Sequence, residues 1–240
     1  MSKTYVVTGA SRGLGLEFVS QLAGKGNTVF ACARNPGNSD RLQKLAENKN
    51  VFAIKLDTTN VESIKSAAEE ISKNAPQGID VLINNAGIGG EKSKSPETLL
   101  EDDLNTIFQT NVVGVSNVTK EFLPLLRKRG QDNVKKIVNI SSILGSIELI
   151  NQVSPAGAQP SYNISKAALN MYVKMLANNL AKENFIVYSS HPGWVKTDMG
   201  GDSAPVEIKD SIAGQLAKLE SVTAKDNGGF FDFEGKTLPW

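Results

Sequence analysis

The chain has 240 residues, of which 26 are Lys or Arg and 25 are Asp or Glu, so its formal net charge is +1. This balance gives no electrostatic reason to bind nucleic acid or an acidic membrane surface, and no apolar stretch approaches the length of a membrane span. One cysteine, Cys32, and one histidine, His191, exclude an intrachain disulfide and provide no metal-binding cluster. The first apolar run begins at Thr4, too early for a signal peptide, and we expect a cytoplasmic protein.

Short apolar runs alternate with segments of helical periodicity along the chain. The runs lack polar–apolar alternation, which is typical of parallel strands covered on both faces. The predicted strands are Thr4–Thr8, Thr28–Ala33, Val51–Leu56, Val81–Ile83, Lys136–Ile140, Ile186–Ser190 and Gly229–Phe231. The predicted helices are Gly13–Lys25, Ser39–Lys49, Val61–Asn74, Leu100–Lys128, Ser161–Lys182 and Ile208–Leu219, with Asn60 and Ser161 as candidate N-caps. This order predicts a single-domain Rossmann fold over residues 1–240, a doubly wound parallel sheet of about seven strands with helices on both faces.

A glycine-rich turn joins the first predicted strand to the first predicted helix. Its glycines follow the pattern G-x-x-x-G-x-G, which permits a tight turn, close approach to a phosphate and close helix–strand packing. A plain strand–helix turn would explain the glycines too, but the flanking strand and amphipathic helix favour a pyrophosphate site. The predicted cofactor contacts in this turn are Gly9, Ser11, Arg12, Gly13, Leu14 and Gly15.

The end of the second predicted strand indicates which dinucleotide binds. A protein that binds NAD usually carries an acid about 20 residues beyond the turn, where it bonds the ribose hydroxyls. Here the strand ends at Ala33 and Arg34, and no carboxylate stands at that place. Arg34 and Arg12 could converge on a 2′-phosphate as charge-assisted donors, or both could be solvated surface side chains. The missing acid favours the first alternative and NADP(H) as the cofactor.

A proton donor is suggested by Tyr162 and Lys166, which lie one helical turn apart on the same face. A free tyrosine has a pKa of about 10, and a nearby ammonium is expected to lower that pKa. Tyr162 could then give its proton to a carbonyl oxygen while a nicotinamide supplies hydride, and Ser142 could bond the same oxygen. Lys166 would hold the nicotinamide ribose. A helical pair and a strand-end serine are also ordinary structural features, but their order along the chain favours carbonyl reduction.

Together these segments resemble the short-chain dehydrogenase/reductase family over nearly the whole chain. The matching segments are Thr8 to Gly15, Asp57, Asn84 to Gly87, Asn111, Ser142, Tyr162 with Lys166, and Pro192 with Gly193. The tail from Gly229 to Trp240 is similar to that of the small carbonyl reductases of the C-factor and sniffer type. The resemblance implies NADPH-dependent reduction of an aldehyde or ketone to an alcohol.

The resemblance implies further roles for residues outside the central group. Asp57 would contact the adenine ring, with a loop or cap aspartate as the alternative. Asn111 would position a water at the end of the proton path. Asn84 would tie neighbouring strands and contact the cofactor, together with Ala86 and Gly87. The remaining predicted cofactor contacts are Tyr162, Lys166, Pro192, Gly193, Val195 and Thr197.

Two long loops, Ile143–Pro160 and Trp194–Pro205, follow strand ends and are predicted to wall a substrate pocket, the second as a lid. Their apolar residues favour a hydrophobic carbonyl compound, although such residues also form ordinary small cores. These residues are Ile143, Leu144, Leu149, Ile150, Val153, Trp194 and Met199. Ser142 precedes Tyr162 by more residues than is usual in the family, so the extra length must loop out.

Oligomeric state and the possibility of a non-catalytic role complete the predictions. The helix from Ser161 is apolar on more than one face, which favours a homodimer or homotetramer. The alternative to an enzyme is a cofactor-sensing or signalling protein on the same fold. A sensor would not need the combination of Asn111, Ser142, Tyr162 and Lys166, so we favour the enzyme.

Overall fold

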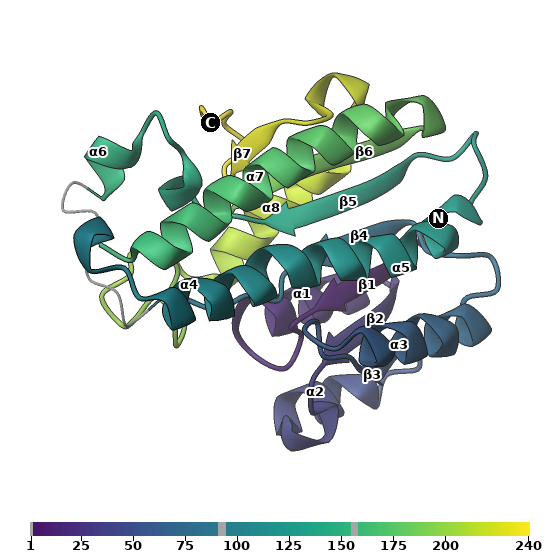
Figure 1. The fold of residues 1–240 in the computed structure, drawn as a ribbon. Coiled ribbons are helices and arrows are strands. Elements are labelled where there is room, and N and C mark those ends of the chain that lie inside the picture. The colour runs from purple at the N-terminus through teal and green to yellow at the C-terminus, as the bar shows by residue number, and fades with distance from the viewer. Residues whose placement is uncertain (1, 91–94, 155–157) are drawn as a thin grey trace.

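The computed structural model describes residues 2–90, 95–154 and 158–240, so Pro155 and Gly157 of the first predicted loop lie outside the described residues. A seven-stranded, wholly parallel sheet has the order β3-β2-β1-β4-β5-β6-β7 (Figure 1). The strands are β1 Thr4–Thr8, β2 Thr28–Ala33, β3 Val51–Lys55, β4 Val81–Asn84, β5 Lys135–Ile140, β6 Phe185–His191 and β7 Phe230–Asp232. The predicted Rossmann fold is confirmed.

Helices cover both faces of the sheet because successive strand residues point to opposite sides. Val7 belongs to a core formed with α1, α2 and α8, whereas its neighbour Val6 belongs to a core formed with α3, α5 and α7. Figure 1 shows α5 and α7 running along one face of the sheet. The helices are α1 Gly13–Gly24, α2 Asp40–Ala46, α3 Val61–Asn74, α4 Glu101–Phe108, α5 Val115–Arg127, α6 Ile150–Val153, α7 Pro160–Leu180 and α8 Ile208–Ser221.

The long helix predicted over Leu100–Lys128 is interrupted. A wide π-helical turn, Gln109–Gly114, separates α4 from α5. Two tertiary contacts explain the widening: a Cβ on Gly114 would lie 2.8 Å from the Thr58 carbonyl oxygen, and the Asn111 side chain bonds the backbone of Ile88. Turns of this kind are frequent at functional sites.

The two predicted N-caps have different outcomes. The Asn60 side chain accepts a hydrogen bond from the Ser63 backbone N–H at 2.9 Å, so this N-cap of α3 is confirmed. The prediction for Ser161 is wrong, because α7 already begins at Pro160 after Gln159, which adopts a left-handed φ of 58°. Ser161 instead donates its hydroxyl to the Asp103 carboxylate at 2.6 Å and thereby ties α7 to α4.

Three further findings concern Cys32, membrane-spanning helices and metal-binding groups. Cys32 is fully buried, and burial raises the pKa of its thiol, as expected for an inert core cysteine. Within the described ranges, no helix is long and apolar enough to cross a membrane. The same ranges contain no group of three or more His, Cys, Asp or Glu side chains that could hold a metal ion.

Candidate active site

The predicted site segments meet at the carboxyl edge of the sheet. β1 lies between β2 and β4, so the chain reverses its direction of travel across the sheet between β1 and β4. Doubly wound sheets bind ligands at such a switch point, outside the carboxyl ends of the strands. The glycine turn follows β1, Ala86 and Gly87 follow β4, and Ser142 follows β5.

The glycine turn has the geometry that a phosphate site requires. Gly9 and Gly13 have positive φ values of 67° and 53°, which favour glycine. A Cβ on Gly15 would lie 2.3 Å from the Gly9 carbonyl oxygen, so only glycine permits this close packing. Within the described residues, the side chain of the N-cap residue Arg12 makes no capping hydrogen bond, and the first turn of α1 carries no acidic residue. The backbone N–H groups there are therefore suited to an anion such as a pyrophosphate.

The two arginines have different surroundings. Arg34 is exposed beyond the end of β2 and makes no ion pair with any residue that the structure describes. The Arg12 Nη1 lies 2.6 Å from the Asp198 Oδ2, and the side chains of this pair are 75% and 77% exposed. The absence of a carboxylate at Ala33 and the presence of two solvent-facing guanidinium groups fit a dinucleotide with a 2′-phosphate.

Asp57 takes the structural role that was the alternative to adenine contact. Its Oδ1 accepts hydrogen bonds from the Thr59 backbone N–H at 2.9 Å and from the Thr59 hydroxyl at 2.8 Å. These bonds stabilise the turn between β3 and α3. The predicted contact with adenine remains a prediction.

The segment after β4 is held by polar contacts to its neighbours. The buried Asn84 Nδ2 donates to Thr119 Oγ1 at 3.0 Å and to Asn139 Oδ1 at 2.9 Å, which ties β4 to α5 and β5. The Ala86 backbone N–H donates to Thr8 Oγ1 at 3.1 Å. A Cβ on Gly87 would lie 3.2 Å from Asn111 Oδ1. Asn84 is thus part of the scaffold, and its cofactor contact stays a prediction.

Ser142, Tyr162 and Lys166 converge in one group, in which Ser142 and Lys166 are buried and Tyr162 is half-buried. The Ser142 side chain is near enough to the Tyr162 phenol to lower its pKa, and its Oγ accepts a hydrogen bond from the Leu144 N–H at 3.2 Å. The Lys166 Nζ lies 5.5 Å from the centre of the Tyr162 ring and donates to the Ile140 carbonyl at 2.8 Å. The structure therefore brings together the three residues that the sequence predicts as the centre of a carbonyl-reducing site.

The pKa of Tyr162 differs from the sequence-based expectation. Burial raises the pKa of Tyr162 to about 12, and the nearby Ser142 side chain opposes that shift. Burial also lowers the pKa of Lys166 to about 8. The predicted lowering of the tyrosine pKa is wrong for this structure because desolvation of the phenolate is the larger effect. The phenol is protonated at neutral pH, as a proton donor must be.

Asn111 links the segment after β4 to α7. Its Nδ2 donates to the Ile88 carbonyl at 2.9 Å and to Ser165 Oγ at 3.0 Å, while its Oδ1 accepts from the Ile88 N–H at 2.9 Å. Ser165 in turn donates to the Tyr162 carbonyl at 2.8 Å. Because both amide hydrogens are used, a water at the Asn111 side chain could only be a donor to it.

The loop after Ser142 is pinned to α7 by residues that the sequence analysis did not identify. Ser141 donates to Asn170 Oδ1 at 2.7 Å, and Asn170 Nδ2 donates to the Gly145 carbonyl at 3.4 Å. The position of Asn170, one helical turn after Lys166, is a signal that could have indicated this role. The extra length before Tyr162 loops out into α6, and the Glu148 N–H donates to the carbonyl of Trp240 at the chain end.

The loop after β6 lies against the glycine turn and the segment after β4. Pro192 accepts a 2.6 Å hydrogen bond from Ser211, and Gly193 has a φ of 85°. Val195 is buried and pairs with Val206, which closes the base of the loop. A Cβ on Gly13 would lie 3.7 Å from Thr197 Cγ2.

The apolar residues predicted to wall the pocket are only partly covered. Trp194 is 56% and Met199 58% exposed. A Cβ on Gly89 would lie 3.6 Å from the Met199 side chain, so the loop reaches the segment after β4. The other five are half-buried, namely Ile143, Leu144, Leu149, Ile150 and Val153. Accessible apolar side chains at this edge suit a hydrophobic ligand.

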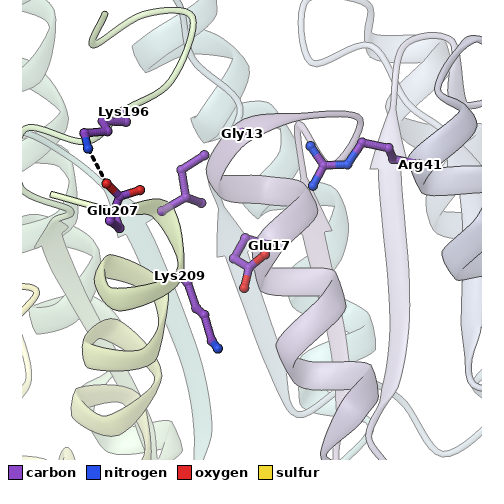
Figure 2. Close-up of a pocket in the computed structure, with 7 residues that line it drawn as sticks. Gly13, Glu17, Arg41, Lys196, Glu207 and Lys209 are labelled. Carbon is purple, nitrogen blue, oxygen red and sulfur yellow. Dashed lines mark hydrogen bonds and ion pairs between the residues drawn. The ribbon is translucent and has the colours of Figure 1, made fainter. Parts of the chain in front are cut away.

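A hollow of about 260 Å³ lies beside the glycine turn (Figure 2). It is bounded by the start of α1, by Arg41 of α2 and by the start of α8, and Lys196 and Glu207 on its rim form an ion pair. Its lining residues are Gly13, Glu17, Arg41, Lys196, Glu207, Ile208 and Lys209. None of the central group Ser142, Tyr162 and Lys166 contributes to it.

Known proteins share this architecture along the whole chain. An uncharacterised oxidoreductase of Schizosaccharomyces pombe is 36% identical over 261 aligned residues, covering 100% of this chain and 98% of that protein. The NADPH-bound carbonyl reductase from chicken fatty liver has a TM-score of 0.92 and 34% identity, covering 100% of this chain and 99% of that one. The carbonyl reductase Sniffer of D. melanogaster has a TM-score of 0.93 and 34% identity, with full coverage of both chains.

These similarities confirm the predicted resemblance to sniffer-type carbonyl reductases. A family model described as short chain dehydrogenase matches residues 3–207. Because that match spans more than half of the chain and the relatives align along all of it, this chain belongs to the short-chain dehydrogenase family.

Proposed function

We propose that this protein reduces an aldehyde or ketone to an alcohol with NADPH, and that Tyr162 is the proton donor. The observation that carries the proposal is the half-buried Tyr162, which lies next to Ser142 and Lys166 at the same sheet edge as the glycine turn that opens α1. The similarity to a carbonyl reductase whose structure contains NADPH supports both the reaction and the cofactor.

Each residue of the group has a chemical task in this proposal. Bound NADPH would supply the hydride. Tyr162, whose pKa is raised to about 12, holds a proton for the carbonyl oxygen, and Ser142 orients that oxygen by a second hydrogen bond. Lys166 supplies a positive charge near the phenolate that forms and binds the nicotinamide ribose. Asn111 fixes the backbone at Ile88 and, through Ser165, the start of α7.

The cofactor would lie across the carboxyl edge of the sheet. The turn from Gly9 to Gly15 would bind the pyrophosphate, and Arg12 and Arg34 the 2′-phosphate. Asp57, Ala86 and Gly87 are proposed contacts of the adenosine half. Pro192, Gly193, Val195 and Thr197 are proposed contacts of the nicotinamide half.

The wider setting is also part of the proposal. The apolar side chains of the two loops, with Trp194 and Met199 the most exposed, support a hydrophobic carbonyl substrate. We propose that residues 1–240 act as one catalytic domain, in the cytoplasm, as a homodimer or homotetramer.

The proposal is tested by a panel of aliphatic and aromatic aldehydes and ketones, supplied with NADPH or with NADH. The expected result is carbonyl-dependent loss of the nicotinamide absorbance, faster with NADPH at equal concentrations. Tight binding of NADPH without turnover of any carbonyl would support a cofactor-sensing protein instead.

A further inference from the structure

Arg12, one of the two proposed readers of the 2′-phosphate, already has an anionic partner. Its Nη1 lies 2.6 Å from the Asp198 Oδ2, and the two residues lie 186 positions apart in the chain. Arg12 precedes the first residue of α1, whereas Asp198 lies near the tip of the loop after β6. Arg34 differs, because it has no ion pair with any residue in the described ranges.

The local packing holds Asp198 in this position. The loop is closed at its base by the pairing of Val195 with Val206, and Thr197 Cγ2 would lie 3.7 Å from a Cβ on Gly13. Thr197 also accepts a hydrogen bond from the Gly200 N–H at 3.1 Å, which shapes the turn around Asp198. These contacts within the loop hold Asp198 next to Arg12.

The nearby cation Lys196 has its own anionic partner and does not compete with Arg12 for Asp198. The neighbouring cation Lys196 pairs with Glu207 across the base of the loop. The side chains of Arg12 and Asp198 are 75% and 77% exposed, so solvent screens their ion pair and it is readily broken. A phosphate dianion offers Arg12 a stronger partner than one carboxylate.

We propose that Asp198 is a specificity-determining residue, which lowers the affinity for NADPH by competing with the 2′-phosphate for Arg12. This inference rests on the proposed function. NADH carries no 2′-phosphate and leaves the Arg12–Asp198 pair intact, so its affinity does not depend on the competition. Arg12 and Arg34 make the protein bind NADPH more tightly than NADH, and Asp198 reduces this difference in affinity.

The experiment measures the dissociation constants of NADPH and NADH by isothermal titration calorimetry for the wild type and Asp198→Asn. The variant keeps the shape of the side chain and removes its charge. We expect NADPH to bind about two- to fivefold more tightly, the range expected for loss of an exposed ion pair, and NADH to bind as in the wild type. Asp202→Asn, which neutralises another exposed acid of the same loop, should change neither constant.

A double-mutant cycle then tests whether the effect passes through Arg12. In an Arg12→Ala background, Asp198→Asn should leave the NADPH constant unchanged. Equal tightening in that background would overturn the inference in favour of a general electrostatic effect. Weaker binding of both cofactors in Asp198→Asn would also overturn the inference, because the ion pair would then support binding of either dinucleotide. Unchanged binding of NADPH in Asp198→Asn would overturn the inference as well.

Failure of the proposed function gives a different result. If the wild type binds NADPH no more tightly than NADH, the 2′-phosphate is not read, and both the cofactor assignment and this inference are wrong. A wild type that prefers NADPH, together with an Asp198→Asn variant of unchanged affinity, contradicts this inference alone.

Discussion

At the scale of single residues, burial displaces the pKa values of Tyr162 and Lys166 in opposite directions. The pKa of the Tyr162 phenol is raised to about 12 and the pKa of the Lys166 ammonium is lowered to about 8, because in each case the charged form loses its hydration. Both shifts favour the neutral side chains, so the site holds the proton on Tyr162 at neutral pH. The charge on Lys166 is the part of the site that pH can change within the accessible range.

A pH dependence of the reaction follows from Lys166. As the pH rises through about 8, the ammonium loses its proton, while Tyr162 stays protonated until about 12. We therefore expect kcat/KM for carbonyl reduction to be constant at neutral pH and to fall above about pH 8. In Lys166→Arg, whose guanidinium stays charged, the residual activity should lack this fall. A wild-type profile that is flat up to pH 10 would show that the ammonium is not required.

Recognition of the NADPH 2′-phosphate is expected to depend on the Arg34 side chain. A hydrogen bond to a charged group contributes about 1.5–3 kcal/mol, so Arg34→Ala should weaken NADPH binding on the order of tenfold or more. The affinity for NADH should barely change. Adding Ala33→Asp to Arg34→Ala should go further, since the new carboxylate repels the phosphate and accepts from ribose hydroxyls. Equal weakening of both cofactors in Arg34→Ala, measured as dissociation constants, would contradict this role.

His191 links pH to folding stability. Burial lowers the pKa of His191 to about 4, which the charge of Asp232 opposes, and its Nδ1 has no hydrogen-bond partner within the described residues. Between pH 6.5 and about 4 the unfolded chain binds a proton that the folded chain does not. The free energy of unfolding should therefore fall as the pH is lowered through this window.

The measurement for His191 compares urea denaturation at pH 7 and pH 5 in the wild type and in His191→Gln. The wild type should lose on the order of 1–2 kcal/mol more than the variant between these two pH values. The wild type and the variant share their carboxylates, so the contribution of these groups to the pH dependence cancels in the comparison. Equal losses would mean that the imidazole is protonated in the folded state.

At the scale of elements, the strands follow closely from the sequence. Each predicted strand is present with ends within one residue of those observed, because a fully buried strand needs an unbroken apolar run. The helix over Leu100–Lys128 was predicted without its π-helical turn. That turn depends on Asn111, which bonds the backbone of a residue 23 positions away, and periodicity carries no information about such a contact.

In the site too, residues that belong to sequence motifs could be predicted, and residues that depend on contacts distant in the chain could not. Ser142, Tyr162 and Lys166 follow motifs of fixed order, and the structure brings them together. Asp198 and Asp103 were missed, since their partners Arg12 and Ser161 lie 186 and 58 positions away in the chain. An exposed acid in a loop has no sequence pattern that sets it apart, so Asp198 becomes recognisable only in three dimensions.

At the scale of the whole molecule, α7 leaves an apolar stripe uncovered. Val173 and Leu180 are in the core, but Ile164, Met171 and Met175 are 42%, 62% and 64% exposed and follow the spacing of one helix face. We expect this stripe to be buried in a homodimer or homotetramer. Light scattering at micromolar concentration should give at least twice the mass of one chain. Met171→Glu combined with Met175→Glu should reduce it, whereas a monomeric wild type would contradict the prediction.

The central claim is that Tyr162 gives a proton to a carbonyl oxygen in an NADPH-dependent reduction. The most direct test compares Tyr162→Phe with the wild type in two measurements, kcat on the best carbonyl substrate and the dissociation constant of NADPH. The variant keeps the ring and removes only the donor. The account predicts that kcat falls about 10²–10⁴-fold while NADPH binding changes by no more than about twofold. A kcat within about twofold of the wild type, with NADPH still bound, would contradict it.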